Sequence, residues 1–502
     1  MVDSLVFENE VVKEILEKYR AIWAIGHAQA LLSWDSETYM PRGGVEERAV
    51  ARAELSLLAQ KLILSPEFTQ LVEKAEKVEN LNDYERGVVR VLSREIRIMR
   101  AIPPRLLAEL EKTTQEAMHA WRAAKETDDF NKFKPYLEKI VKLTREKADC
   151  LGWKDHPYDA LLDLYEEGLT TRDVDNILTP LTSELKSILE KVEAEGRYPR
   201  KHPLEDVKYE RAWMEAVNSE VLKLLGYPLG ERARLDVSAH PFTIEIGLDD
   251  VRITTRYEGF DFKRSLLSTV HEFGHATYEL QIDPALKYTP IATGVSLGVH
   301  EGQSRFWENI VGRSREFVQL VYPVLKKHLP FIEKYTPEDV YLYFNVVRPS
   351  LIRTEADEVT YNLHIALRAR LEKLMLTGEV KVGDLPELWN NYMEELLGVR
   401  PGRHSEGVLQ DIHWSMGSIG YFPTYTLGNI VAAQMMYAME REVGLREKVA
   451  KGDFSAIKEW QKNRVHRFGS TYPPKELLKR ALGGEYNVEY LLKYLREKYL
   501  SH

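Results

Sequence analysis

The chain of 502 residues contains a single cysteine, Cys150. One cysteine cannot form a disulfide within the chain, which is typical of proteins from a reducing cytoplasm. Long apolar runs are also missing, because no stretch approaches the ~20 apolar residues that a transmembrane helix needs. Residues 1–20 are charged throughout, unlike a signal peptide. We therefore expect a cytoplasmic protein without membrane partners.

An excess of positive charge is missing as well. Lys and Arg number 69 against 78 Asp and Glu, a net charge of −9, which argues against nucleic acid as the main partner. We find no internal repeat, low-complexity tract or clear linker. Hydrophobic residues make up 44% of the chain, enough for a large core. Composition thus predicts a large globular protein, and its function has to be inferred from motifs.

Apolar residues at helical spacing predict a mainly α fold. Two short β-branched segments, 242–246 and 251–257, predict a hairpin with a third strand nearby. We expect one large helical domain over residues 1–502, with a deep substrate cleft between two lobes and a small antiparallel β element. The predicted helices cover residues 8–37, 45–64, 81–101, 104–125, 130–149, 171–195, 205–225, 265–282, 299–311, 315–328, 337–347, 355–376, 385–397, 427–442, 455–465 and 486–499.

The helix predicted at 265–282 contains the sequence HEFGH at residues 271–275. Residues four apart share one face of a helix, so His271 and His275 can bind one metal ion. Two imidazoles suit zinc, which takes nitrogen ligands in tetrahedral geometry. Glu272 projects beside the metal, where it can accept a proton from a metal-bound water.

Histidines on amphipathic helices are more often residues at the edge of a core, so the motif needs support. Gly274 supplies some, because a glycine inside a helix costs on the order of 1 kcal/mol relative to alanine and is justified by close approach of a ligand or backbone. A catalytic zinc has three protein ligands. Glu301, 26 residues after His275, is the best candidate for the third. The alternative is that Glu301 is a surface acid.

The sequence HEFGH followed by HEGQSRFWEN at residues 300–309 resembles the M32 family of metallocarboxypeptidases. The resemblance extends over nearly the whole chain and rests on several motifs in the family's order. These are WD at 34–35, MP at 40–41, HPF at 240–242, DVRIT at 250–254, IRTEAD at 352–357 and GVLQDIHW at 407–414.

The resemblance implies a helical fold with a cleft, similar to neurolysin and angiotensin-converting enzyme. It also implies one zinc ion per subunit, for which cobalt can substitute, and a homodimer. The implied activity is removal of single C-terminal residues from peptides, with broad specificity and poor action at proline.

An exopeptidase of this kind must recognise a free carboxylate, which arginine binds best through its planar fork. Arg353, in the IRTEAD motif, is our first choice, and Arg252, on the predicted hairpin, is the alternative. For each, the competing interpretation is an ion pair with a nearby acid such as Asp357 or Asp250, respectively.

Attack on an amide builds negative charge on the carbonyl oxygen, which a neutral donor can share with the metal. Tyr421 and Tyr425 are candidates by resemblance to related helical zinc peptidases, and the sequence does not choose between them. His413 and His240 are candidates for substrate binding or for support of the metal ligands. Each of these four residues has a purely structural alternative.

Three functions therefore compete. The first is a zinc carboxypeptidase and the second a zinc endo-oligopeptidase with the same metal centre. The third is a helical peptide-binding protein that kept the site without turnover, against which the intact Glu272 argues.

Overall fold

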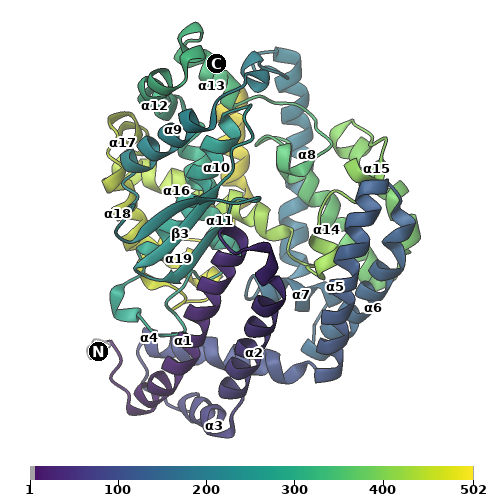
Figure 1. Cartoon of the computed structure of the whole chain (residues 1–502), viewed down its shortest axis with the longest axis vertical. Helices are drawn as coiled ribbons and strands as arrows, with labels where there is room; N and C mark the ends of the chain where they lie inside the picture. The colour runs from purple at the N-terminus through teal and green to yellow at the C-terminus, as the bar shows by residue number, and fades with distance from the viewer. Residues whose placement is uncertain (1–5, 501–502) are drawn as a thin grey trace. The chain divides into compact units, whose positions relative to one another are not determined.

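The computed structural model describes residues 6–500, and within that range it contains twenty α-helices and one three-stranded sheet (Figure 1). The mainly α class with a small β element is as predicted. The chain divides into two compact units, whereas a single domain around a cleft stays a prediction. Unit 1 consists of residues up to 97, 203–344 and 434–485, and unit 2 consists of residues 98–202, 345–433 and those from 486 onward.

Unit 1 begins with α1 (Glu10–Thr38) and α2 (Val45–Ile63), which lie side by side (Figure 1). Helix α2 ends one residue before its predicted end at residue 64, and the dipeptide Ser65-Pro66 that follows starts α3 (Pro66–Ala75). The Ser65 hydroxyl accepts a hydrogen bond from the N–H of Phe68, and Pro66 occupies the first helical position. The other helices of unit 1 outside the metal centre are α9 (Arg211–Leu224), α12 (Arg315–His328), α13 (Pro337–Phe344), α17 (Leu445–Lys451), α18 (Phe454–Arg464) and α19 (Pro474–Leu482).

The sheet of unit 1 has the order β1-β3-β2. Strands β2 (Thr243–Gly247) and β3 (Asp250–Thr255) form the predicted antiparallel hairpin, with a two-residue turn. The third strand, β1 (Ala233–Val237), pairs with β3 in parallel. The sheet is therefore mixed, because the chain crosses from β1 to β2 before it returns beside β1. In this order, β2 is an edge strand.

Two helices of unit 1 carry the motif residues. Helix α10 (Lys263–Leu280) packs against the sheet and against α11 (Leu297–Arg305). A side-chain carbon at Gly274 would lie only 2.6 Å from the carbonyl oxygen of Gln303 and the Cα of Ser304. The glycine inside α10 is thus explained by the close approach of the α11 backbone. A π-helical segment, Phe306–Val311, continues directly from α11.

Some helices of unit 2 match their predicted ends, and others are shifted by several residues. Helix α8 (Thr171–Glu195) matches its prediction at both ends, because Thr170 and Asp173 form a capping box and Gly196 ends the helix with φ 65°. The others are α5 (Pro104–Thr127), α6 (Lys134–Leu151), α7 (Pro157–Tyr165), α14 (Tyr361–Thr377), α15 (Leu385–Leu397) and α20 (Val488–Leu500).

Two helices continue across a boundary between the units, namely α4 (Asp83–Ala101) and α16 (Pro423–Val443). The helix predicted from residue 355 begins later, at Tyr361, and Arg353 lies in a separate 3₁₀ turn. The short helices α3, α7, α17 and α19 were not predicted. None of the helices within residues 6–500 combines the length and the apolar character that a membrane span requires.

Candidate metal centre and active site

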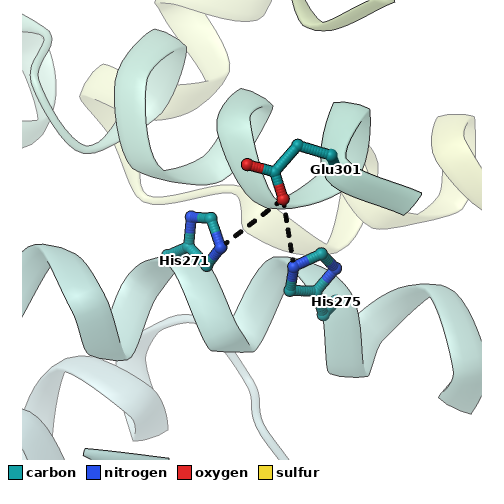
Figure 2. Close-up of side chains that lie close together, drawn as sticks. All are labelled: His271, His275 and Glu301. Atoms are coloured by element: carbon teal, nitrogen blue, oxygen red, sulfur yellow. Dashed lines mark ion pairs between the residues drawn. The ribbon is translucent and has the colours of Figure 1, made fainter. Parts of the chain in front are cut away.

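The three predicted ligands come together between α10 and α11 in unit 1. Oε2 of Glu301 lies 3.7 Å from Nε2 of His271 and 3.4 Å from Nε2 of His275, and both imidazoles point at this one oxygen (Figure 2). Ligand atoms bound to zinc at ~2.0–2.1 Å in a tetrahedron stand about 3.3 Å apart. Two imidazole nitrogens and one carboxylate oxygen at this spacing fit a zinc ion.

His271 is held by a carboxylate on the π-helical segment. Its Nδ1 lies 2.8 Å from Oε2 of Glu308. Arg305 and His271 lower the pKa of Glu308 to about 2 although burial opposes the shift, so Glu308 is an anion that accepts the Nδ1 proton. This bond leaves Nε2 of His271 free to bind a metal and fixes the orientation of the ring.

His275 is held by a second histidine instead. Its Nδ1 lies 2.8 Å from Nδ1 of His300, and Nε2 of His300 lies 2.6 Å from Oε1 of Glu279. If Nε2 of His275 binds metal, its Nδ1 must donate. His300 then accepts at Nδ1 and donates from Nε2 to the carboxylate of Glu279. Gly294 makes room for this arrangement, because a side-chain carbon there would lie 2.5 Å from the His300 ring.

Glu272 lies between the two histidines in sequence but outside the ligand set. Its side chain is buried, and its Oε2 accepts a hydrogen bond of 2.6 Å from the hydroxyl of Thr243 on β2. The hairpin therefore orients the carboxylate that the sequence assigned as general base.

The two other predicted site residues of unit 1 differ in their surroundings. Arg252, on β3, makes two hydrogen bonds of 2.7 Å to Asp250 and covers the ring of Trp34 at 4.4 Å. This is the ion pair that we considered as the alternative role for Arg252. His240 lies exposed in the connection between β1 and β2.

Arg353 lies in unit 2, in a buried group of charges. Its Nε and Nη2 donate to Oδ1 of Asp411 at 3.0 and 2.8 Å, and Arg368 donates from Nε to the other oxygen of Asp411 at 2.6 Å. The expected alternative partner of Arg353 was wrong, because Asp357 instead accepts backbone N–H groups, including that of Arg348. Two guanidinium groups thus share one carboxylate, which leaves an excess of one positive charge.

The remaining candidates lie beside Arg353. The guanidinium carbon of Arg353 is 5.1 Å from the ring centre of Tyr425, whose hydroxyl is 3.2 Å from Nε2 of His413. The rings of Tyr421 and Tyr425 are 5.4 Å apart. Burial lowers the pKa of His413 to about 4, and the two arginines act in the same direction. The histidine is therefore neutral at pH 7, so the cluster keeps its charge excess.

The loop that presents His413 and Tyr421 is fixed by a buried acid, Glu372 of α14. Its carboxylate accepts hydrogen bonds from Trp414 Nε1 at 2.9 Å, from the Gly420 N–H at 3.0 Å and from the Tyr158 hydroxyl at 2.6 Å. Burial raises the pKa of Glu372 to about 7, although these hydrogen bonds oppose the shift.

We expect this acid to make the protein less stable as the pH rises. A carboxyl group with a raised pKa in the folded state stabilises fully below its ordinary pKa and loses that contribution as pH rises through the folded value. Between pH 5 and pH 8, Glu372 should lower the free energy of unfolding by roughly 2 to 3 kcal/mol. Denaturant unfolding across this range should show the loss in the natural protein and not in Glu372→Gln. If the free energy of unfolding falls equally with pH in both proteins, Glu372 is not the group responsible.

Several residues of the metal centre were missed in the sequence. Glu308 and Arg305 stand seven and four residues after Glu301, a helical spacing that could have identified them. Glu279 also has this spacing, because it stands four residues after His275 on α10. Thr243 carries no such signal, because its contact depends on how β2 folds against α10.

The fold and the site together define a class. A helical protein with an HExxH helix, a glutamate on the next helix that faces both histidines and a buried glutamate beside them has the build of a metallopeptidase. Comparison with known families identifies the group: residues 14–499 match the family described as carboxypeptidase Taq (M32) metallopeptidase, and the chain belongs to this family. It is therefore a carboxypeptidase of the M32 type.

Characterised relatives agree with this family. The chain is 61% identical over 496 residues to thermostable carboxypeptidase 1 of Pyrococcus furiosus, with 99% of both chains covered. It is 39% identical to thermostable carboxypeptidase 1 of Thermus thermophilus, with 97% of this chain and 98% of the relative covered.

Solved structures agree as well. A carboxypeptidase structure from P. furiosus superposes with a TM-score of 0.98 at 61% identity, covering 99% of this chain and all of the other. An M32 carboxypeptidase from Deinococcus radiodurans R1 superposes with a TM-score of 0.94 at 35% identity, covering 98% and 99%.

Proposed function

We propose that this protein is a zinc-dependent metallocarboxypeptidase that releases single C-terminal amino acids. The observation that carries the proposal is the convergence of His271, His275 and Glu301 at distances that suit one zinc ion, with Glu272 beside them. We assign one zinc ion to each subunit, and cobalt, which takes similar ligands, should substitute for it.

Zinc bound here would supply a Lewis acid that polarises the scissile carbonyl and makes water more acidic. Glu272 would accept the proton of the attacking water and then deliver it to the leaving amine. Thr243 would hold the Glu272 carboxylate in place through its hydroxyl. Glu308 and His300 would keep the two imidazoles in the tautomer that presents Nε2.

We assign recognition of the substrate carboxylate to Arg353. The pair Arg252–Asp250 is neutral, and its two strong hydrogen bonds occupy one edge of the fork. The group around Arg353 has one positive charge in excess, and three of its five N–H donors are used, one by Tyr361 and two by Asp411. A carboxylate would neutralise this excess, which supports Arg353 over Arg252.

The assignment predicts a specific change in substrate preference. The natural protein should cleave a peptide with a free C-terminus much faster than its C-terminal amide. In Arg353→Ala, kcat/KM for the acid should fall at least about 100-fold, because two charge-assisted hydrogen bonds are lost, whereas the amide should be affected little. Arg353→Lys keeps the charge without the fork and should show an intermediate loss. The measurement is a digestion time course of the two peptides with metal-loaded protein.

The control is Arg252→Ala, which should leave the preference intact. If the preference survives in Arg353→Ala and disappears in Arg252→Ala, the arginine of β3 is the anchor. Internal cleavage of the amide peptide by the natural protein would instead favour an endo-oligopeptidase. Metal content should stay unchanged in all three variants, because none alters a ligand.

The remaining assignments concern charge stabilisation and assembly. Tyr421 or Tyr425 would donate to the carbonyl oxygen, with His413 oriented by Tyr425, and His240, being exposed, would contact bound peptide. We further propose broad specificity with poor action at proline and a homodimer, both on the strength of the resemblance. A cytoplasmic location is proposed from the single cysteine.

A further inference from the structure

We propose that Arg305 restricts Glu301 to a single coordinating oxygen and thereby keeps one position at the metal open for water or substrate. The inference rests on the proposed metal site and concerns how many atoms its glutamate supplies. The evidence is that the two carboxylate oxygens of Glu301 contact different groups.

The two oxygens face different partners. Oε1 accepts a hydrogen bond of 2.7 Å from Nε of Arg305, one turn further along α11. Oε2 faces Nε2 of both His271 and His275 and also accepts a hydrogen bond of 3.1 Å from the hydroxyl of Ser304. Only Oε2 is therefore directed at the position where a metal would lie.

Because both side chains are buried, rotating the Glu301 carboxylate away from Arg305 would be costly. The side chain of Glu301 is 10% exposed and that of Arg305 is 15% exposed. Oε1 can turn toward the metal only by leaving the guanidinium of Arg305, and breaking a charge-assisted hydrogen bond between two buried charged groups is costly. A charge-assisted bond of 2.7 Å thus holds the carboxylate in the orientation that suits one-oxygen binding.

The same guanidinium reaches the support of a second ligand. Nη1 of Arg305 lies 3.3 Å from Oε2 of Glu308, the oxygen that accepts the Nδ1 proton of His271. Arg305 therefore links Glu301 and the carboxylate that orients His271. The π-helical segment starts immediately after Arg305 and carries Glu308, and such segments often occur at functional sites.

The number of oxygens matters for the reaction. A catalytic zinc site keeps a fourth position beside three protein ligand atoms. A glutamate that bound through both oxygens would fill that position or crowd it. Arg305 is in this view a positioning residue, which acts on the metal through Glu301.

The experiment is X-ray absorption spectroscopy at the zinc edge of the full-length, zinc-loaded protein. The natural protein should show four light-atom ligands, two of them imidazoles. Arg305→Met keeps the length of the side chain and removes the charge and donors. Its coordination number should rise from four to five, because the freed Oε1 can also bind, and zinc affinity measured by chelator competition should change by about 10- to 100-fold, as expected for residues that contact ligands.

Arg313→Met is the matched control. Arg313 contacts Glu308 through Nη2 at 3.4 Å but does not bond Glu301, so this variant should keep four ligands. Arg305→Lys restores a cation at the same place and should return the count toward four. Arg305→Gln provides a second neutral variant if Arg305→Met does not fold. Four ligands in both neutral variants, or five in the natural protein, would overturn the proposal.

The result is separable from the proposed function. If the natural protein takes up no zinc, or shows no imidazole ligands, the metal site itself is wrong. If it shows two imidazoles and Arg305 variants leave the spectrum unchanged, the metal site stands and only the role of Arg305 is rejected.

Discussion

Glu272→Gln is expected to retain the metal and to lose nearly all turnover. The glutamine amide matches the carboxylate in shape and can still accept the hydrogen bond from Thr243, but it cannot take a proton from water. Loss of a general base alone reduces the rate by ~10²–10⁴-fold. The measurement is kcat on a free-acid peptide, together with zinc content after dialysis. A variant with near-normal kcat would show that Glu272 is not the base.

A milder change tests the orientation of the same carboxylate. Thr243→Val is close in shape and removes only the hydroxyl that lies 2.6 Å from Glu272. Its kcat should fall less than that of Glu272→Gln, and its metal content should stay unchanged. A loss of metal in Thr243→Val would mean that β2 supports the ligands rather than the base.

Glu301→Ala is expected to lose the metal. Within residues 6–500, Glu301 supplies the carboxylate oxygen that faces both imidazoles, and its removal leaves two ligands for an ion that needs three from the protein. Zinc affinity should fall by more than the ~10–100-fold typical of residues behind the ligands. The measurement is zinc retained after mild chelation, together with affinity by competition.

Glu308→Ala is the variant with which the loss of zinc affinity in Glu301→Ala should be compared. Glu308 contacts His271 and does not face the metal position. Its affinity loss should lie within the ~10–100-fold range. If Glu301→Ala keeps its zinc under chelation that strips Glu308→Ala, the ligand assignment has to be exchanged between the two residues.

The sequence predicted His271 and His275 as a pair that can bind one metal because helical spacing is local information. His271 and His275 share a face of α10 whatever the rest of the chain does. Gly274 pointed to a close approach, and the structure shows that the α11 backbone is the partner. The same approach brings Glu301 within 3.4 Å of His275.

Contacts that depend on tertiary placement were not predictable in this way. Asp411 binds Arg353 across 58 residues, whereas the nearby Asp357 has a different role. Strand β1 pairs in parallel after a crossover, which a hairpin pattern does not indicate. His300 was read only as part of a motif, although it links His275 to Glu279.

The division into two units has a consequence for biosynthesis. The chain passes between the units five times, and two of these passages lie inside α4 and α16. Unit 1 is incomplete until residues up to 485 have been made, and unit 2 also needs residues beyond 486. Neither unit can finish folding while the ribosome is still producing the middle of the chain. The protein therefore cannot fold one unit at a time from the N-terminus during synthesis. A fragment confined to residues 203–344 would contain every proposed zinc ligand and still lack the remainder of its own unit.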